Sequence, residues 1–141
     1  MRQLSTALLL SLVLATGAQA QSLSWTTLAQ AQTAKEKYDL QTQCARQAAE
    51  VFKKESNSEA VNYEDHYNSR LNKCFYIEIT NGYDEHLKAP VKDMMLNDLN
   101  ENRVLASYHK WGNTVELCVV EQKQCKTEEE WLALIKPFME D

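Results

Sequence analysis

The sequence predicts a small α+β domain with N-terminal helices, a mainly antiparallel sheet of three or four strands, a C-terminal helix and two disulfides. Three observations lead to this prediction: a long segment near the start free of glycine and proline, alternating apolar residues in the middle, and an amphipathic helical pattern at the end. Only three glycines and two prolines occur among 141 residues. That scarcity disfavours a loop-dominated scaffold and a glycine-rich phosphate loop.

The first twenty residues have the layout of a secretory signal peptide. A charged start at Arg2 precedes an apolar run over residues 8–15, and the small residues Ala18 and Ala20 end the segment. The run is much shorter than the roughly 20 apolar residues of a membrane-spanning helix. We therefore expect cleavage after Ala20, a single globular domain over residues 21–141, export to the periplasm or the medium, and no membrane span.

The charge balance is acidic. The chain has 20 acidic and 15 basic residues and a formal net charge of -5, and loss of Arg2 with the leader makes it one unit more negative. The basic residues are scattered along the sequence. Nucleic-acid binding is disfavoured, because affinity for a phosphate backbone depends on clustered lysine and arginine.

Four cysteines lie in the expected mature chain, and an even number in an exported protein predicts disulfides. Three connectivities are possible, and we favour Cys44–Cys74 with Cys118–Cys125, since each pair is nearest in the chain. A zinc site usually has cysteines two to four residues apart, and redox sites often have C-x-x-C. Neither spacing occurs here, so structural disulfides are favoured over metal or redox chemistry.

Two helices are predicted before the sheet. Residues 26–55 contain no glycine or proline and are rich in strong helix formers, and residues 56–58 are expected to end this helix. The apolar positions of its second half are Leu40, Cys44, Ala48, Val51 and Phe52. A shorter helix is predicted within residues 59–73, because aromatic and apolar residues there follow one another at intervals of four, four and three, which places them on one face of a helix. The residues on that face are Tyr63, Tyr67, Leu71 and Cys74.

A half-buried strand is predicted over residues 75–80, where apolar and more polar residues alternate. The residues on its core side are Phe75, Ile77 and Ile79. We expect Asn81-Gly82 to turn the chain out of the strand, and residues 83–92 to form a loop around Pro90.

A second strand and a hairpin are predicted next. Residues 93–99 fit a strand or a helix, and the turn residues at 100–102 favour the strand. Segments 104–111 and 114–120 flank Gly112-Asn113, a two-residue hairpin signal. The residues of the last strand expected to face the core are Val115, Leu117 and Val119.

The C-terminal helix has the clearest signals. Thr127 and Glu130 form a capping box, and acidic residues in the first turn suit the positive end of the helix dipole. Pro137 is expected to stop the helix. The apolar stripe that should pack on the sheet is Trp131, Leu134, Ile135 and Phe138.

The densest polar and aromatic cluster surrounds His66. None of the three histidines has the spacing of a known metal motif, and no catalytic constellation is present. On a helix, His66 and Arg70 would share a face. The favoured interpretation is structural: His66 or Asn68 hydrogen-bonds the backbone. The functional alternatives are that the cluster contacts a ligand or a partner, or that it supplies a general base. The candidate contact residues are His66, Tyr67, Asn68 and Arg70.

A calcium site is the other candidate considered from the side chains. The carboxylates that could supply its oxygen ligands are Glu64, Asp65, Asp84 and Glu85. They are dispersed and lack the stepwise loop that such sites use, so a solvated acidic face is favoured and no metal is predicted.

The stretch from His66 to Phe75 reads HYN-xx-LNKCF. Together with Cys44-Ala45, segments 99–102 and 106–108, and the ending from Trp131 to Glu140, it resembles a group of small exported bacterial proteins. The resemblance covers most of the expected mature chain. It implies a bacterial source and a periplasmic or secreted address, and it carries over no activity and no site residue.

These observations predict a non-enzymatic binding or interaction module, such as an inhibitor or an immunity-type protein, with a protein partner in the envelope or medium and no cofactor. An acidic chain could block a basic enzyme, such as a lysozyme-like hydrolase, by electrostatic complementarity.

Two other hypotheses remain open. The first is a small enzyme or a metal or ligand binder centred on His66, with Asp65, Tyr67 or His109 brought near by the fold. The second is a purely structural component of the envelope, with a homodimer as one form, which an exposed aromatic patch would support. The aromatic residues considered for that patch are Trp25, Tyr38 and Trp111.

Overall fold

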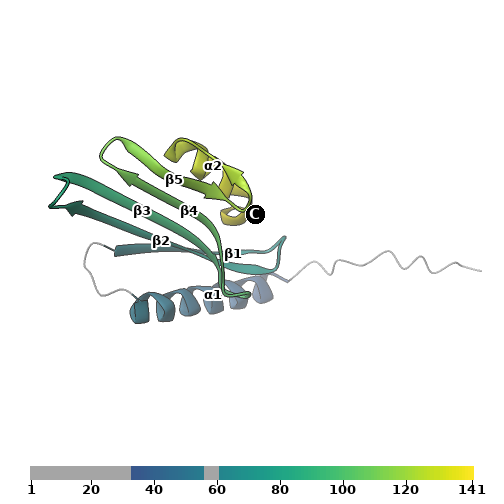
Figure 1. Ribbon diagram of the computed structural model, residues 1–141. Coiled ribbons are helices and arrows are strands. Elements are labelled where there is room, and N and C mark those ends of the chain that lie inside the picture. Colours follow the sequence, from purple (N-terminus) through teal and green to yellow (C-terminus); the bar gives the residue numbers. More distant parts are fainter. Residues whose placement is uncertain (1–32, 56–60) are drawn as a thin grey trace, which may run out of the picture. The chain divides into compact units, whose positions relative to one another are not determined.

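A six-stranded antiparallel sheet and two helices form the described part of the chain, which comprises residues 33–55 and 61–141 of a computed structural model (Figure 1). The expected leader, Trp25 and the expected helix end at residues 56–58 lie outside the described residues. In chain order the elements are α1 (Ala34–Glu55), β1 (Val61–Asn68), β2 (Lys73–Asp84), β3 (Ala89–Asp98), β4 (Arg103–Trp111), β5 (Thr114–Val120), β6 (Lys123–Gln124) and α2 (Glu128–Met139).

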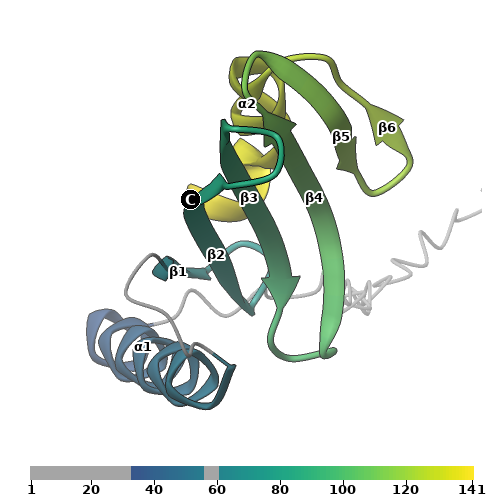
Figure 2. The ribbon, with the colours of Figure 1, turned by 60° about the vertical axis from the view of Figure 1, so that its left-hand side comes forward.

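The strands lie side by side in the order in which they occur in the sequence, and every neighbouring pair is antiparallel (Figure 2). The α+β prediction is confirmed, as is the antiparallel sheet. The predicted number of three or four strands is wrong, because β1 was expected to be helical and β6 is only two residues long.

Helix α1 packs on β1 and β2. It begins with a capping box, in which the Thr33 hydroxyl accepts from the Glu36 N–H and the Glu36 carboxylate accepts from the Thr33 N–H. Cys44 and Ala48 are buried against the sheet, and the Cys44–Cys74 disulfide joins the helix to β2. The predicted helix is thus confirmed over Ala34–Glu55, and so is this cysteine pairing.

The predicted helix within residues 59–73 is wrong, because Val61–Asn68 forms an edge strand paired with β2. Tyr63 and Tyr67 do share a face, but a spacing of four is an even number and places two residues on the same side of a strand as well as of a helix. Leu71 lies in the following turn, where Asn72 has a left-handed backbone with φ of 52°. Asparagine tolerates that conformation better than most residues.

Strand β2 is longer than predicted. Asn81 and Gly82 pair with β3 instead of turning the chain, and the expected loop at 83–92 contains strand residues up to Asp84 and from Ala89 onwards. The turn lies between them, where the Asp84 carboxylate accepts the N–H groups of His86 and Leu87. The predicted strand at 93–99 is confirmed up to Asp98, within β3.

The β4–β5 hairpin around Gly112-Asn113 is confirmed, and Val115 packs against the core as predicted, but the predicted inward facing of Leu117 and Val119 is wrong. Leu117 is exposed, whereas Cys118 and Val120 are buried. A bulge shifts the pairing between His109 and Lys110, so one residue of β5 has no opposite partner. An extra residue in a strand changes which of the following side chains face the core. Val115 therefore faces the core, whereas Leu117, beyond the bulge, faces solvent.

Helix α2 covers the face of the sheet opposite to α1. Thr127 is its N-cap and accepts from the Glu130 N–H, as predicted, while the Glu130 carboxylate accepts from the Lys126 N–H. The helix continues past Pro137 to Met139. The predicted stripe of α2 belongs to the main core, whose buried residues are Phe75, Ile77, Met94, Leu96, Leu105, Ala106, Tyr108, Cys118, Val120, Trp131 and Ile135.

The second predicted disulfide, Cys118–Cys125, is also present. It links β5 to the segment that leads into α2, and the Cys125 N–H donates to the Cys118 carbonyl at 3.0 Å. Neither helix in the described part of the chain has the length and apolar character needed to span a membrane.

Candidate functional site

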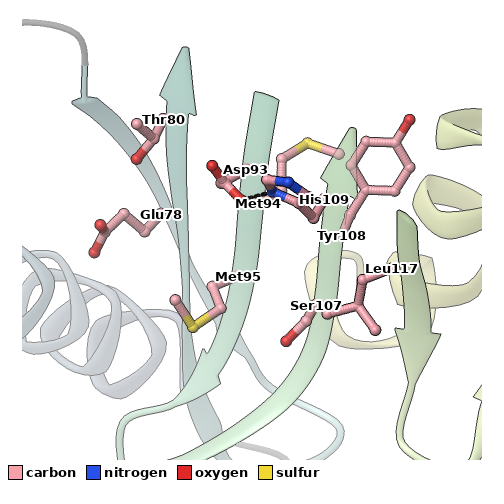
Figure 3. A pocket seen from close by; sticks show the side chains of 9 residues that line it. All are labelled: Glu78, Thr80, Asp93, Met94, Met95, Ser107, Tyr108, His109 and Leu117. Atoms are coloured by element: carbon pink, nitrogen blue, oxygen red, sulfur yellow. Dashed lines mark hydrogen bonds and ion pairs between the residues drawn. The ribbon is translucent and has the colours of Figure 1, made fainter. Parts of the chain in front are cut away.

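The two faces of the sheet are covered unequally. Helix α2 lies on one face, and on the other face α1 packs mainly against β1 and β2. The part of that second face formed mainly by β3, β4 and β5 carries no described helix, and we call it the open face. Its side chains are Glu78, Thr80, Asp93, Met95, Ser107, His109 and Leu117 (Figure 3).

Strand register arranges these side chains in two rows across the sheet, because residues directly opposite each other in a ladder point to the same face. The first row runs through Glu78, Met95, Ser107 and Val119. The second row, two residues further along each strand, runs through Thr80, Asp93, His109 and Leu117. Four successive strands therefore build the open face.

A histidine flanked by two carboxylates lies at its centre. Nδ1 of His109 hydrogen-bonds Oδ1 of Asp93 across the β3–β4 ladder, as the dashed line in Figure 3 marks. Nε2 of His109 lies 3.8 Å from Oε2 of Glu116, which is the residue at the β5 bulge. Both ring nitrogens face carboxylate oxygens, so the imidazole is fixed in position between two acidic side chains.

Apolar side chains flank this cluster. Met95 is 42% exposed and Leu117 is 47% exposed. Between them and the polar residues lies a shallow hollow of about 170 Å³. The ring of Trp111 lies 6.4 Å from that of His109, and its indole nitrogen is buried without a hydrogen-bond partner among the described residues. The open face thus combines carboxylates with exposed apolar groups.

The lysines of the same strands point to the other face. Nζ of Lys92, the residue before Asp93, pairs with Glu128 of α2. Lys110, the residue after His109, interacts electrostatically with Glu129 of α2. Because successive side chains of a strand point to opposite faces, β3 and β4 separate these groups, with Lys92 and Lys110 toward α2 and Asp93 and His109 on the open face.

A second candidate site surrounds His66, in a groove of about 610 Å³ between β1 and α2. Ile77, Ile135 and Met139 contribute apolar walls, and charged side chains from both elements line the rest. Nε2 of His66 is buried without a hydrogen-bond partner among the described residues and lies 3.6 Å from Oδ1 of Asp141. The carboxylate near the His66 ring nitrogen is thus that of Asp141. His109, which was considered as a neighbour of His66, pairs with Asp93 on the open face instead.

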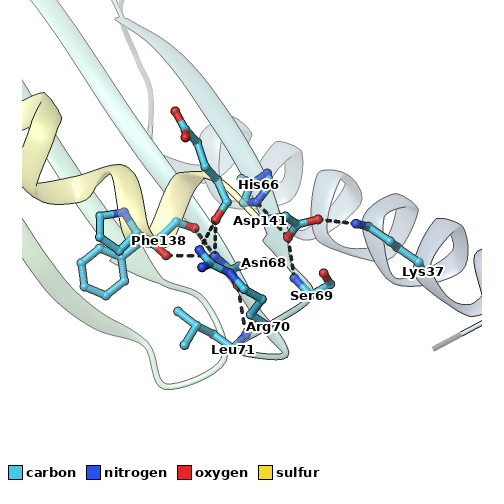
Figure 4. Close-up of polar contacts among 10 residues, drawn as sticks. Lys37, His66, Asn68, Ser69, Arg70, Leu71, Phe138 and Asp141 are labelled. Carbon is cyan, nitrogen blue, oxygen red and sulfur yellow. Dashed lines mark hydrogen bonds and ion pairs between the residues drawn. The ribbon is translucent and has the colours of Figure 1, made fainter. Parts of the chain in front are cut away.

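The residues around His66 hold the C-terminal segment in place (Figure 4). The Asn68 side-chain amide donates to the carbonyls of Pro137, Phe138 and Glu140, and Arg70 donates to the Glu140 carbonyl. Asn68 is fully buried. The structural interpretation of this cluster is thus correct for Asn68, although the carbonyls to which its amide donates belong to α2 and the residue after it.

Asp141 completes this arrangement. Its carboxylate pairs with Lys37 of α1 and accepts the Ser69 N–H at 2.8 Å. The hydrogen bond from Lys37 holds the pKa of Asp141 well below its usual value. We call the contacts of Asn68, Arg70 and Asp141 the C-terminal clasp.

The predicted contact residues therefore have different surroundings. Tyr67 is buried beside Cys44 and donates its hydroxyl to Oδ1 of Asn72, while Asn68 and Arg70 belong to the clasp. Of the predicted set, His66 lines a groove. Among residues 33–55 and 61–141 no group of three metal-ligating side chains could hold a metal ion, and the acidic residues considered for calcium do not gather.

The aromatic residues considered for a dimer patch do not gather either. Tyr38 is 67% exposed on α1, whereas Trp111 is half-buried beside His109 on β4. No family model, curated protein or solved structure matches the chain.

Sequence reasoning missed the open face. Its residues come from four strands, and two of these strands were predicted with the wrong length or facing. The local signal for it is weak, because Asp93 marks the open side of β3 but Met94, Met95 and Leu96 are consecutive apolar residues. The alternation that distinguishes the two sides of a strand is therefore missing there.

Proposed function

We propose that this protein is an exported, non-enzymatic binding module, of the inhibitor or immunity type, that recognises a protein partner through the open face. The observation that carries the proposal is the set of exposed apolar side chains, Met95 and Leu117, next to polar groups on the part of the sheet face that no described helix covers. Exposed apolar groups with a polar surround are typical of protein interaction sites.

The shape of the open face favours a protein over a small molecule. Its hollow of about 170 Å³ is smaller than the roughly 300–1,000 Å³ of most small-molecule pockets. His109 supports binding rather than catalysis, because its Nε2 faces the Glu116 carboxylate and not a hydroxyl or thiol that it could deprotonate. A fixed imidazole instead adds a rigid polar contact.

Export is part of the proposal. The first twenty residues have the charged start, apolar run and small-residue end of a signal peptide. Two disulfides and no free cysteine in the described residues fit an oxidising compartment, where such bonds persist. The periplasm and the external medium both fit these features.

The proposal is tested by quantitative capture of partners from the native envelope and medium with three variants. Leu117→Asp places a charge on the open face, Leu132→Asp places one on α2 at the His66 groove, and Leu87→Asp places one in the β2–β3 turn. The three leucines are 47%, 47% and 50% exposed, so each substitution should leave the fold intact.

We expect a near-stoichiometric protein partner with the wild type and with Leu87→Asp, and its loss with Leu117→Asp. A partner that is kept by Leu117→Asp would overturn the assignment to the open face. Absence of any stoichiometric protein in the wild-type capture would overturn the binding-module proposal itself.

The His66 groove is the second candidate, as a small-ligand site. The buried Nε2 of His66, which makes no hydrogen bond with the described residues, favours it together with the apolar walls, since such a nitrogen can hydrogen-bond a ligand. Loss of a bound small molecule with Leu132→Asp and with His66→Phe, but not with Leu117→Asp, would support this alternative. Mass spectrometry of the native protein and these variants makes the comparison.

A further inference from the structure

We infer that the partner of the open face is a cationic protein surface, in which arginine or lysine side chains stand beside apolar ones. This inference rests on the proposed function and specifies the chemistry of its partner.

The open face is acidic. Glu78, Asp93 and Glu116 place three carboxylates on or beside it, with His109 as the ionisable base among them. The neighbouring lysines of β3 and β4 are turned toward α2, as the Lys92–Glu128 pair demonstrates. The negative potential is therefore produced by the strand pattern of the face itself, and not only by the net charge of -5.

The carboxylates retain acceptor capacity. Asp93 uses Oδ1 for His109, and Glu116 faces the same imidazole through Oε2. The second oxygen of each group makes no hydrogen bond with the described residues. An arginine guanidinium can donate to such oxygens in a fixed, forked geometry while its flat face and stem lie on apolar groups. Met95 and Leu117 provide those apolar groups within the same face.

Other occupants fit less well. A second copy of the chain, related by a two-fold axis, would bring Glu78, Asp93 and Glu116 opposite the same three carboxylates. Like charges in a desolvated interface cost several kcal/mol in general. A nucleic acid would add its own negative charges to this face. A cationic protein surface, in contrast, would be attracted to the carboxylates of the open face and would avoid the repulsion expected for a second copy or a nucleic acid.

A defined probe tests the inference without knowledge of the natural partner. Amide chemical shifts of the oxidised, ¹⁵N-labelled protein are followed while a peptide of alternating arginine and leucine is added, and then its counterpart with glutamate in place of arginine. We expect the arginine peptide to shift the amides of Asp93, Met95, Ser107, His109 and Leu117, and its affinity to fall as salt is added. The glutamate peptide should leave these amides unchanged.

Two charge reversals provide the matched comparison. Glu116→Lys reverses a carboxylate at the open face, whereas Glu50→Lys makes the same charge change at an exposed position on α1. We expect Glu116→Lys to weaken arginine-peptide binding about tenfold or more, and Glu50→Lys to weaken it less than about twofold.

The inference is overturned if the arginine peptide shifts no open-face amide, if the shifts spread equally over the surface, or if the two charge reversals have equal effects. These results would leave the proposed function itself untouched, and two outcomes with the natural partner distinguish the two failures. A natural partner that is lost with Leu117→Asp but is unaffected by Glu116→Lys would keep the binding module and exclude a cationic partner surface. A natural partner unaffected by Leu117→Asp would exclude the open face for both.

Discussion

Asn68 uses both ends of its side-chain amide in a fully buried position at the end of β1. Its Nδ2 donates to carbonyls of Pro137, Phe138 and Glu140, and its Oδ1 accepts the Leu71 N–H. The donor side therefore supports the C-terminal clasp, and the acceptor side supports the β1–β2 turn. The amide suits this position because its donor and its acceptor are separate atoms that point in different directions.

Asn68→Asp is expected to destabilise the protein by about 3 kcal/mol or more, because it keeps the acceptor and replaces the donor with a buried negative charge that faces carbonyl oxygens. Urea denaturation measures the change. Asn62→Asp is the matched control, since Asn62 is exposed and, among the described residues, its side chain accepts only the N–H of Tyr63. A change within about 0.5 kcal/mol is expected there. Equal effects at the two positions would refute the role assigned to Asn68.

Asp98 is a buried charge at the β3–β4 turn. Burial by itself raises its pKa, but hydrogen bonds from Lys73 and from the N–H groups of Asn100 and Glu101 outweigh burial and hold the pKa below its usual value. A carboxyl group with a lowered folded-state pKa stabilises the fold above its unfolded pKa, about 4. That stabilisation is lost as the pH falls through the folded-state pKa.

We therefore expect Asp98→Asn to be less stable than the wild type at neutral pH, by about 1–3 kcal/mol. The difference should shrink as the pH is lowered from about 7 toward 2, because the wild-type carboxylate then becomes protonated. Chemical denaturation of both proteins across this range provides the measurement. A difference that stays constant with pH would show that Asp98 contributes through its shape alone.

At the scale of elements, the two disulfides connect different parts of the fold. Cys44–Cys74 spans 30 residues and joins α1 to β2, while Cys118–Cys125 spans seven and extends the β5–β6 hairpin. In the chain-entropy model the longer loop stabilises by about 3–4 kcal/mol and the shorter by about 2–3 kcal/mol. The first bond therefore also restrains α1 on the sheet.

Replacing Cys44 and Cys74 with alanine should therefore cost more stability than replacing Cys118 and Cys125. We further expect amide hydrogen exchange to accelerate through α1 in the first variant while β3, β4 and α2 stay protected. Exchange measured by mass spectrometry resolves these segments. Uniform acceleration across the whole sheet would mean that α1 and the sheet open as one unit.

The sequence predicted elements well where one signal was unambiguous. The capping box at Thr127, the apolar stripe of α2 and the hairpin at Gly112 each exclude other local structures, and all three are present. The nearest-neighbour pairing of the cysteines was also sufficient for both disulfides.

Prediction failed where two structures share one signal. Tyr63 and Tyr67, four residues apart, lie on one side of a helix or of a strand, so only pairing with β2 decides between them. The facing of Leu117 depends on a bulge, which is a property of two strands together. Predicting the open face requires knowing how four strands align with one another, and local sequence patterns do not determine this alignment.

At the scale of the whole molecule, the charge pattern makes a prediction about self-association. At low ionic strength we expect the oxidised protein to stay monomeric, because its open-face carboxylates repel those of another copy. Salt at about 0.5 M screens this repulsion and should increase association through Met95 and Leu117. Sedimentation at both salt concentrations tests this expectation, with Leu117→Asp as the control that should remain monomeric throughout. A dimer that forms at low salt and dissociates at high salt would contradict it.

The sequential order of the six strands also has a consequence for how the chain reaches its native state. Every ladder joins segments that are adjacent in the sequence, and such local pairing shortens the conformational search and favours rapid folding. The hairpins can form one after another, from β1 to β6, as the polypeptide becomes available. The clasp, in contrast, joins β1 to residues about 70 positions later in the chain, so we expect its formation to be the late event that completes the fold.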